Sequence, residues 1–250
     1  MFSVSAENMD FFFQNPCDFL YDDVYYLKDK SHGHPRKADA SLKKNTKIST
    51  AVIRRLPRYY RHLEALHQNG VVRISSSALG ERTGLTASQI RQDLSCFGEF
   101  GQQGYGYNVE NLMAEIADIM GMNKGHTAVV VGAGRLGRAL LANFPFDHYG
   151  ISLSAIYDID PRIVGTKIGG VPVYPTNELN TRLAAKPVDI GILTVPPGVA
   201  AETANRLACL GVKGIWNFTN MELGLHLTDL VVENVHFSDS LLALSYMISE

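Results

Sequence analysis

A glycine-rich turn between an apolar strand and a helix is the feature that most constrains how this chain folds. The β-branched and apolar run 127–131 is followed directly by the letters GAGRLG, which place Gly132, Gly134 and Gly137 in the spacing GxGxxG. In such a turn the first glycine permits the tight bend and the second lets the backbone approach a pyrophosphate. The third allows close packing of helix on strand. The sequence therefore predicts a βαβ unit with a dinucleotide at its turn.

An acidic residue lies where such a turn places the partner of the ribose. Asp158 follows the turn by about 20 residues, at the end of the next predicted strand. A carboxylate there accepts hydrogen bonds from the adenosine ribose diol and repels a 2′-phosphate, so NAD (NADH and NAD+) is favoured over NADP. The helix that begins at the turn offers unpaired N–H groups to the phosphates. Besides Asp158, the predicted contacts are Gly132, Ala133, Gly134, Arg135, Leu136 and Gly137.

Strand and helix patterns alternate through residues 127–225, which is typical of a doubly wound parallel sheet of Rossmann type. Two predicted strands end in the segments LTVPPG and WNFT. The carboxyl ends of parallel strands face the ligand crevice in this fold, so both segments are candidate walls for the nicotinamide half. The candidate residues are Thr194, Val195, Pro196, Asn217 and Phe218.

Residues 46–108 form a different kind of segment. Apolar residues at helical spacing predict helical structure over 50–69, and Pro57 is expected to divide it into two pieces. A short helix opens after Ser75, and Thr86 caps a third helix with Gln89 in the capping-box position. The glycine-rich letters GEFGQQGYGYNV then predict a β-hairpin. Three helices and a hairpin in this order predict a winged helix-turn-helix domain.

The charge of that segment favours an anionic partner. Residues 46–108 carry 8 Lys and Arg against 4 Asp and Glu, whereas residues 109–250 carry 9 against 14. In a winged helix-turn-helix the third helix enters the major groove of DNA, while basic side chains elsewhere hold phosphates. The predicted DNA contacts are Arg54, Arg55, Arg58, Ser88, Gln89, Arg91, Gln92 and Tyr105. A solvated basic face on a small helical domain is the alternative.

The remaining segments complete the predicted organisation. Residues 1–45 are expected to be a disordered extension, because the aromatic cluster over 11–26 lacks clean periodicity and residues 29–45 have a polar composition. Residues 109–126 are expected to form a linker helix. Residues 226–250 end in an apolar helix that needs a partner surface. Neither an apolar run long enough to span a membrane nor a good leader peptide is present, so we expect a cytoplasmic protein without membrane contact.

Catalysis is not predicted. The chain contains no nucleophile elbow, P-loop or HExxH motif, and we nominate no catalytic residue and no metal ligand. After residues 127–225 are assigned to the dinucleotide, only residues 226–250 remain, which is too little for the substrate domain of most NAD dehydrogenases. The alternatives left open are an NAD-dependent oxidoreductase with a helical dimerisation domain, a sensor of coenzyme A, and a constitutive DNA-binding protein.

Several strings together closely resemble the Rex family of bacterial redox-sensing repressors. They include RLPRYYRHLEAL, SQIRQDLSCFGEFGQQGYGYNV, GAGRLG, YDIDPRIVGTKIGGVPVY, ILTVP and GIWNFT, and the resemblance covers about residues 47–248. It implies a homodimer that exchanges its C-terminal helix and represses genes by binding a palindromic operator. It also implies that NADH favours a dimer geometry in which the recognition helices no longer match the operator half-sites.

The chain departs from that resemblance at two places. Relatives commonly have an Asp–aromatic pair where this chain has His236-Phe237, and a Tyr where it has Asn143-Phe144. In those relatives the Tyr and Asp couple the nicotinamide redox state to the domain arrangement, so we expect different switch contacts here. The hairpin also reads GQQG where basic residues are common, which predicts weaker phosphate contacts there.

Overall fold

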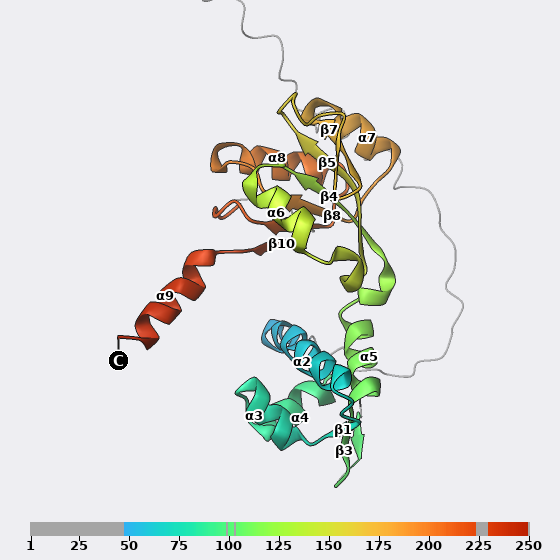
Figure 1. The fold of residues 1–250 in the computed structure, drawn as a ribbon, viewed down its shortest axis with the longest axis vertical. Helices are drawn as coiled ribbons and strands as arrows, with labels where there is room; N and C mark the ends of the chain where they lie inside the picture. The colour runs from blue at the N-terminus through green and yellow to red at the C-terminus, as the bar shows by residue number, and fades with distance from the viewer. Residues whose placement is uncertain (1–47, 99, 103, 224–229, 250) are drawn as a thin grey trace, which may run out of the picture. The chain divides into compact units, whose positions relative to one another are not determined.

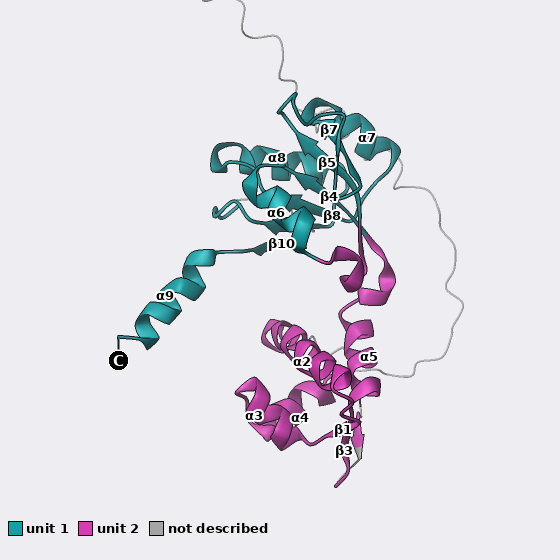
Figure 2. Ribbon diagram, in the orientation of Figure 1, with its two compact units in different colours: residues 1–39, 127–144, 153–250 teal, residues 40–126, 145–152 magenta. Residues whose placement is uncertain are grey.

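The computed structural model describes residues 48–98, 100–102, 104–223 and 230–249. The predicted extension 1–45 lies outside these residues. The chain divides into two compact units, and each is considered by itself (Figure 2). Of the described residues, the helical unit contains 48–126 and 145–152, and the sheet unit contains 127–144 and 153–249.

The helical unit contains the helices and the hairpin in the order that the sequence predicts, together with β1, η1 and η2, which were not predicted (Figure 1). Its antiparallel sheet has the strand order β1-β3-β2, in which β3 pairs with both neighbours. The elements are α2 (Thr50–Gln68), β1 (Arg73–Ile74), α3 (Ser76–Thr83), α4 (Ala87–Ser95), β2 (Gly101–Gln102), β3 (Gly106–Asn108), α5 (Val109–Ile119), η1 (Met122–Lys124) and η2 (Phe146–Tyr149). Three helices followed by a short hairpin confirm the winged helix-turn-helix arrangement.

The expectation that Pro57 divides the first helix is wrong, because α2 runs unbroken through it. Leu56, Tyr59 and Leu63 lie on both sides of the proline step and are buried in one core. Pro57 itself is exposed. Burial of the continuous apolar face outweighs the roughly 3 kcal/mol that an internal proline costs a helix. The helix α5, expected as a linker, is packed into the same core through Leu112.

Residues 145–152 join the helical unit although the chain on either side of them lies in the sheet unit. Phe146 is buried, and the imidazole Nε2 of His148 lies 2.8 Å from a carboxylate oxygen of Glu64 on α2. Gly150 has a φ of +70°, and a Cβ there would overlap the carbonyl oxygen of Met122. Glycine is therefore required where this segment closes against η1.

The sheet unit is a doubly wound sheet with the strand order β10-β9-β8-β4-β5-β7-β6. Within this sheet the neighbouring pairs β10–β9, β9–β8, β8–β4 and β5–β7 are parallel, and the pair β6–β7 is antiparallel. The elements are β4 (His126–Val131), α6 (Arg135–Asn143), β5 (Ile151–Asp158), β6 (Lys167–Ile168), β7 (Val171–Pro175), η3 (Thr176–Glu178), α7 (Leu179–Ala185), β8 (Ile190–Leu193), α8 (Pro197–Cys209), β9 (Gly214–Asn217), β10 (Val231–Asn234) and α9 (Phe237–Met247).

This topology fixes where a ligand crevice opens. The chain moves outward from β4 to β5 and β7, and it then returns to β8 on the other side of β4. The order of strands reverses between β4 and β8, and ligands bind outside the carboxyl ends of the strands at such a point. The predicted Rossmann-type fold is confirmed, whereas the strand β10 was not predicted.

The opposite ends of the central strands are joined by one carboxylate. Asp189, just before β8, accepts hydrogen bonds from the ammonium group of Lys213 (2.8 Å) and from the N–H of Thr127 (3.1 Å). These bonds, that from Lys213 first, lower the pKa of Asp189 to about 2. The amino ends of β4, β8 and β9 are thereby held together, which leaves their carboxyl ends for the crevice.

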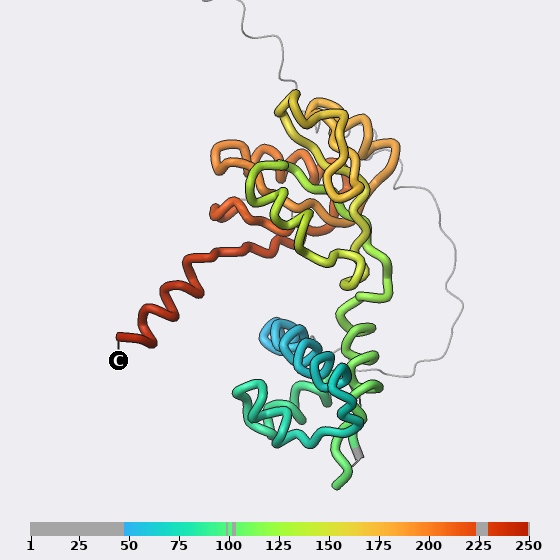
Figure 3. Tube along the Cα trace, viewed as in Figure 1, coloured from blue at the N-terminus to red at the C-terminus, as the bar shows by residue number. Residues whose placement is uncertain are grey.

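The last helix, α9, exposes mainly apolar side chains. Figure 3 follows the chain from β10 into α9, whose large apolar side chains are exposed. The exposed fractions range from 53% at Leu244 to 77% at Ile248, just beyond the helix. Among the described residues, no helix is long and apolar enough to cross a membrane.

Candidate functional site

The three glycines of the turn after β4 meet three different surroundings. Gly132 has a φ of +99°, and a Cβ there would lie 2.7 Å from the carbonyl oxygen of Thr194. A Cβ at Gly137 would overlap the carbonyl oxygen of Gly132. A Cβ at Gly134 would meet no atom within 4 Å. The first and third glycines are therefore required by packing, whereas the second borders open space at the start of α6.

The carboxylate of Asp158 is fixed against this turn. Its Oδ2 accepts the N–H of Ala133 at 2.5 Å, and its Oδ1 accepts the N–H of Asp160 at 2.8 Å. Each oxygen keeps a further lone pair for a hydroxyl donor. The neighbouring Asp160 is instead paired with Arg162, whose hydrogen bonds lower the pKa of Asp160 to about 2. Of the two acids, Asp158 is therefore the one that is fixed against the turn, and its contact with a ribose remains a prediction.

A cavity of about 630 Å³ lies at the carboxyl ends of the central strands, within the size range of small-molecule sites. Six of the predicted cofactor residues line it, namely Gly132, Gly134, Asp158, Thr194, Val195 and Pro196. The hydroxyl of Thr194 donates to the carbonyl oxygen of Gly132 at 2.6 Å, which joins the ends of β4 and β8 at the rim. The turn, the acid and the first strand-end segment therefore come together as the sequence predicts.

The other predicted cofactor residues are not on the wall of this cavity. Ala133 is buried and donates to Asp158. Arg135, Leu136 and Gly137 belong to the first turn of α6, where Arg135 is exposed and Gly137 is buried. Their contact with a cofactor remains a prediction.

The segment after β9 is held by its own contacts. Asn217 is buried, and its amide donates to Asn234 Oδ1 and to the carbonyl oxygen of Met221, each at 2.7 Å. The ring of Phe218 lies 4.6 Å from that of Trp216. Neither Asn217 nor Phe218 lines the cavity that the described residues form. A nicotinamide contact at these two residues stays a prediction.

Sequence reasoning missed one wall of the cavity, which α8 supplies. The lining residues of this helix are Val199, Glu202, Thr203 and Arg206. Their spacing of three and four places them on one helical face, and that pattern was readable in the segment after LTVPPG. Ile159, directly after Asp158, was also missed, and its side chain is 84% exposed on the cavity rim.

The places where the chain departs from its resemblance have local partners. The ring of His236 lies 3.2 Å from Asn220 Oδ1 through Nδ1 and 3.3 Å from Glu222 Oε1 through Nε2. Phe144 packs edge-on against Trp216, with ring centroids 5.3 Å apart. Both departures therefore contact the segment at the end of β9. Their part in a switch remains a prediction.

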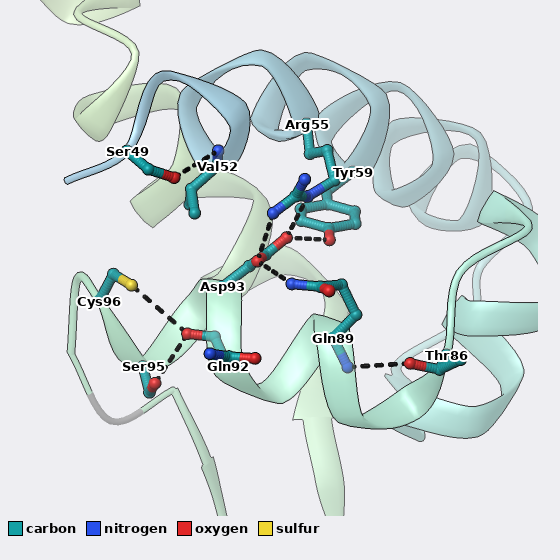
Figure 4. A network of polar contacts seen from close by, with 10 residues as sticks. All are labelled: Ser49, Val52, Arg55, Tyr59, Thr86, Gln89, Gln92, Asp93, Ser95 and Cys96. Carbon is teal, nitrogen blue, oxygen red and sulfur yellow. Dashed lines mark hydrogen bonds and ion pairs between the residues drawn. The ribbon is translucent and has the colours of Figure 1, made fainter.

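The second candidate site is the exposed face of α4, and a buried carboxylate fixes this helix (Figure 4). Asp93 is fully buried and accepts both Nε and Nη2 of Arg55 on α2, at 2.6 and 2.8 Å. It also accepts the hydroxyl of Tyr59 at 2.6 Å and the amide of Gln89 at 2.7 Å. Burial alone raises the pKa of Asp93, but the hydrogen bonds, that from Arg55 first, outweigh it and leave the pKa lowered.

The capping of α4 agrees with the sequence only in part. Thr86 accepts the N–H of Gln89 at 3.1 Å, as predicted. A complete capping box would also need the side-chain oxygen of Gln89 to accept the N–H of Thr86. No such bond is present among the described residues, and the Gln89 amide is turned to Asp93 instead, to which it donates.

The predicted DNA contacts fall into two groups. Arg55 and Gln89 are bound to Asp93, and Arg91 donates from Nη1 to the hydroxyl of Ser76 at 2.8 Å. The others are exposed, namely Arg54, Arg58, Ser88, Gln92 and Tyr105. Tyr105, between β2 and β3, is 70% exposed, with the guanidinium of Arg73 over its ring at 6.0 Å. Contact of either group with DNA remains a prediction.

Two protein-family models match separate parts of the chain. Residues 47–95 match a model described as the N-terminus of a putative DNA-binding protein. Residues 123–221 match a model described as a CoA binding domain.

The chain is also similar over most of its length to curated proteins. It is 49% identical over 209 residues to the redox-sensing transcriptional repressor Rex of Thermoanaerobacter pseudethanolicus, an overlap of 84% of this chain and 93% of the relative. The Rex repressor of Clostridium botulinum is 46% identical over 84% of this chain and 99% of its own length.

Solved structures of a Rex-family repressor called RSP have the same fold. The structure of RSP with β-NAD+ and operator DNA has a TM-score of 0.76 and 49% identity, covering 81% of this chain and 93% of RSP. The structure of RSP with β-NADH has a TM-score of 0.76 and 46% identity, covering 81% and 95%.

Proposed function

This chain belongs to the Rex family of redox-sensing transcriptional repressors, and from that premise we propose that it binds operator DNA through α4 and leaves it when NADH is bound. The observation that carries the proposal is the crevice at the reversal of strand order, where Gly134 borders open space and Asp158 is already oriented. RSP, a relative with the same fold, is known with both β-NAD+ and β-NADH and with operator DNA.

The cofactor we propose is NAD in both redox states. Its pyrophosphate would lie against the turn from Gly132 to Gly137, beside the start of α6, and its adenosine ribose would donate to Asp158. Coenzyme A is the other candidate, because residues 123–221 match a family model described as a CoA binding domain. It carries a phosphate on its adenosine ribose. The fixed carboxylate of Asp158 would repel that phosphate, so the proposed site selects an unmodified ribose diol.

Calorimetry with NADH, NAD+ and coenzyme A tests this assignment. We expect both nicotinamide dinucleotides to bind and coenzyme A not to bind. In Asp158→Ala the two dinucleotides should lose at least 10-fold in affinity, because one charge-assisted contact to the ribose is removed. Binding of coenzyme A as tight as that of NADH would contradict the proposal.

We propose that the acting species is a homodimer formed by exchange of α9. The exposed Phe237, Leu241 and Leu244 of this helix are too apolar to face water. A twofold dimer presents two copies of α4, which fits a palindromic operator with two half-sites. Because chromosomal DNA is the partner, we place the protein in the cytoplasm.

The release step is a difference in affinity between two dimer geometries. If NADH binds the geometry that does not fit DNA about 100-fold more tightly, it opposes DNA binding by roughly 2.7 kcal/mol. NAD+, binding both geometries more evenly, leaves the operator complex in place. The cofactor elements α6 and β5 lead directly into residues 145–152, which belong to the helical unit, so the proposed signal has a covalent route.

A further inference from the structure

The polar side chains of α4 differ in whether they already have hydrogen-bond partners within the protein. Gln89 donates its amide to the buried Asp93, and Arg91 donates to Ser76 on α3. Ser88 and Gln92 are exposed, and neither side chain has a hydrogen-bond partner among the described residues. In Figure 4 the dashed lines at Gln92 reach only its backbone oxygen, which accepts from Ser95 and Cys96.

From this difference we propose that Gln92 is the side chain of α4 that determines which base the protein prefers, and that Gln89 is a positioning residue acting through Asp93. This inference rests on the proposed operator binding. It separates two glutamines that the sequence pattern nominates alike for the same task.

Gln92 has the chemistry for a specific contact. A glutamine amide with donor and acceptor both available pairs with N6 and N7 of adenine in the major groove, and a good pair of this kind discriminates by about 10- to 100-fold. Ser88, one turn earlier on the same face, accepts or donates to any base and carries little discrimination. Gln92 is therefore expected to select adenine at one position of each half-site.

Gln89 is unsuited to that task because its donor is already engaged. Turning the amide toward DNA would take one of the hydrogen bonds from a carboxylate that is fully buried. Arg55, Tyr59 and Gln89 together join α4 to α2, so loss of the Gln89 bond loosens the whole recognition helix. Loosening weakens contact with every sequence equally.

Selection of bound DNA from a randomised palindrome tests the division, using the full-length dimer and its Gln92→Ala and Gln89→Ala variants. The wild-type protein should enrich adenine at one position per half-site. Gln92→Ala should lose that preference by at least 10-fold and leave the other positions unchanged. Gln89→Ala should keep the wild-type preferences at every position while its affinity for the selected DNA falls several-fold.

Thermal melting followed by circular dichroism is the control for folding. Gln92→Ala should have the same melting temperature as the wild type, since the side chain of Gln92 is exposed. Gln89→Lys, which restores a donor facing Asp93, should recover affinity without a new base preference. An unchanged preference in Gln92→Ala, or an altered one in Gln89→Ala, would overturn the inference. Failure of the wild-type protein to enrich any sequence would instead contradict the proposed operator binding.

Discussion

At the scale of single residues, the glycines of the turn after β4 differ in whether packing or the proposed ligand requires them. Gly132 and Gly137 are required because a side chain would meet backbone oxygens. Gly134 has a φ of −67°, which any residue adopts, and open space lies where its Cβ would be. The motif was readable from the sequence, but the packing need at Gly132 and Gly137 and the open space beside Gly134 become visible only in the surroundings of each Cβ.

This difference predicts opposite outcomes for two alanine substitutions. Gly134→Ala should leave the free energy of unfolding within about 0.5 kcal/mol of the wild type but weaken NADH binding at least 10-fold, since the methyl group occupies the pyrophosphate space. Gly137→Ala should lower the free energy of unfolding by about 1–3 kcal/mol, because it forces α6 from β4. Urea unfolding and calorimetry measure the two effects. If the Gly134→Ala protein binds NADH as tightly as the wild type, the pyrophosphate does not lie against this turn.

Asp189 predicts a pH dependence of stability. Its pKa is lowered from 3.8 to about 2 in the folded chain. The ionised carboxylate therefore stabilises the fold fully above pH 3.8, and this contribution is lost as the pH falls toward 2. At pH 7, Asp189→Asn should reduce the free energy of unfolding by about 1–2 kcal/mol, with the partly exposed ion pair discounted for solvent screening.

Urea unfolding at several pH values between 7 and 2.5 provides the measurement. The difference between wild type and Asp189→Asn should shrink below pH 4. Lys213→Met removes the main partner of the carboxylate and should show the same narrowing. A difference that stays constant down to pH 2.5 would argue against the ion pair as its source.

At the scale of elements, the sequence predicted the kinds of helix and strand better than their contacts. Pattern and capping identified α3 and α4, since Ser75, Thr86 and Gly84 are local signals. The continuity of α2 through Pro57 was not predictable from local signals, because it depends on burial along the whole helix. The bond from Arg55 to Asp93 was likewise not predictable from local signals, since the two residues lie 38 positions apart in the sequence.

The helix α9 carries a prediction at this scale. Leu241 and Leu244 lie on one face of the helix and are 65% and 53% exposed. If α9 is exchanged in a dimer, the double variant Leu241→Glu with Leu244→Glu should be monomeric, because two charges would be buried at the interface. Light scattering after size exclusion measures the mass of each species.

Asp239→Asn is the matched control, since it changes a charge on the opposite side of the same helix. It should leave the dimer intact. A double glutamate variant that still elutes as a dimer would show that α9 does not hold the two copies together.

At the scale of the whole molecule, the proposed function requires two sites in one chain. The sequence predicted a DNA-binding segment followed by a dinucleotide-binding segment, and membership of the Rex family agrees with this order. The place of residues 145–152 in the helical unit could not be predicted from the sequence, since it depends on contacts such as that of His148 with Glu64. Such contacts join residues that are distant in sequence and carry no local pattern.

The central claim is that NADH, and not NAD+, releases the protein from DNA. The most direct test is the fraction of a selected operator bound by the full-length protein at constant total dinucleotide and varying NADH-to-NAD+ ratio. We expect the bound fraction to remain high in NAD+ alone and to fall steadily as the NADH share rises. Equal release by both dinucleotides, or no release by NADH at concentrations that calorimetry shows to be saturating, would contradict the account.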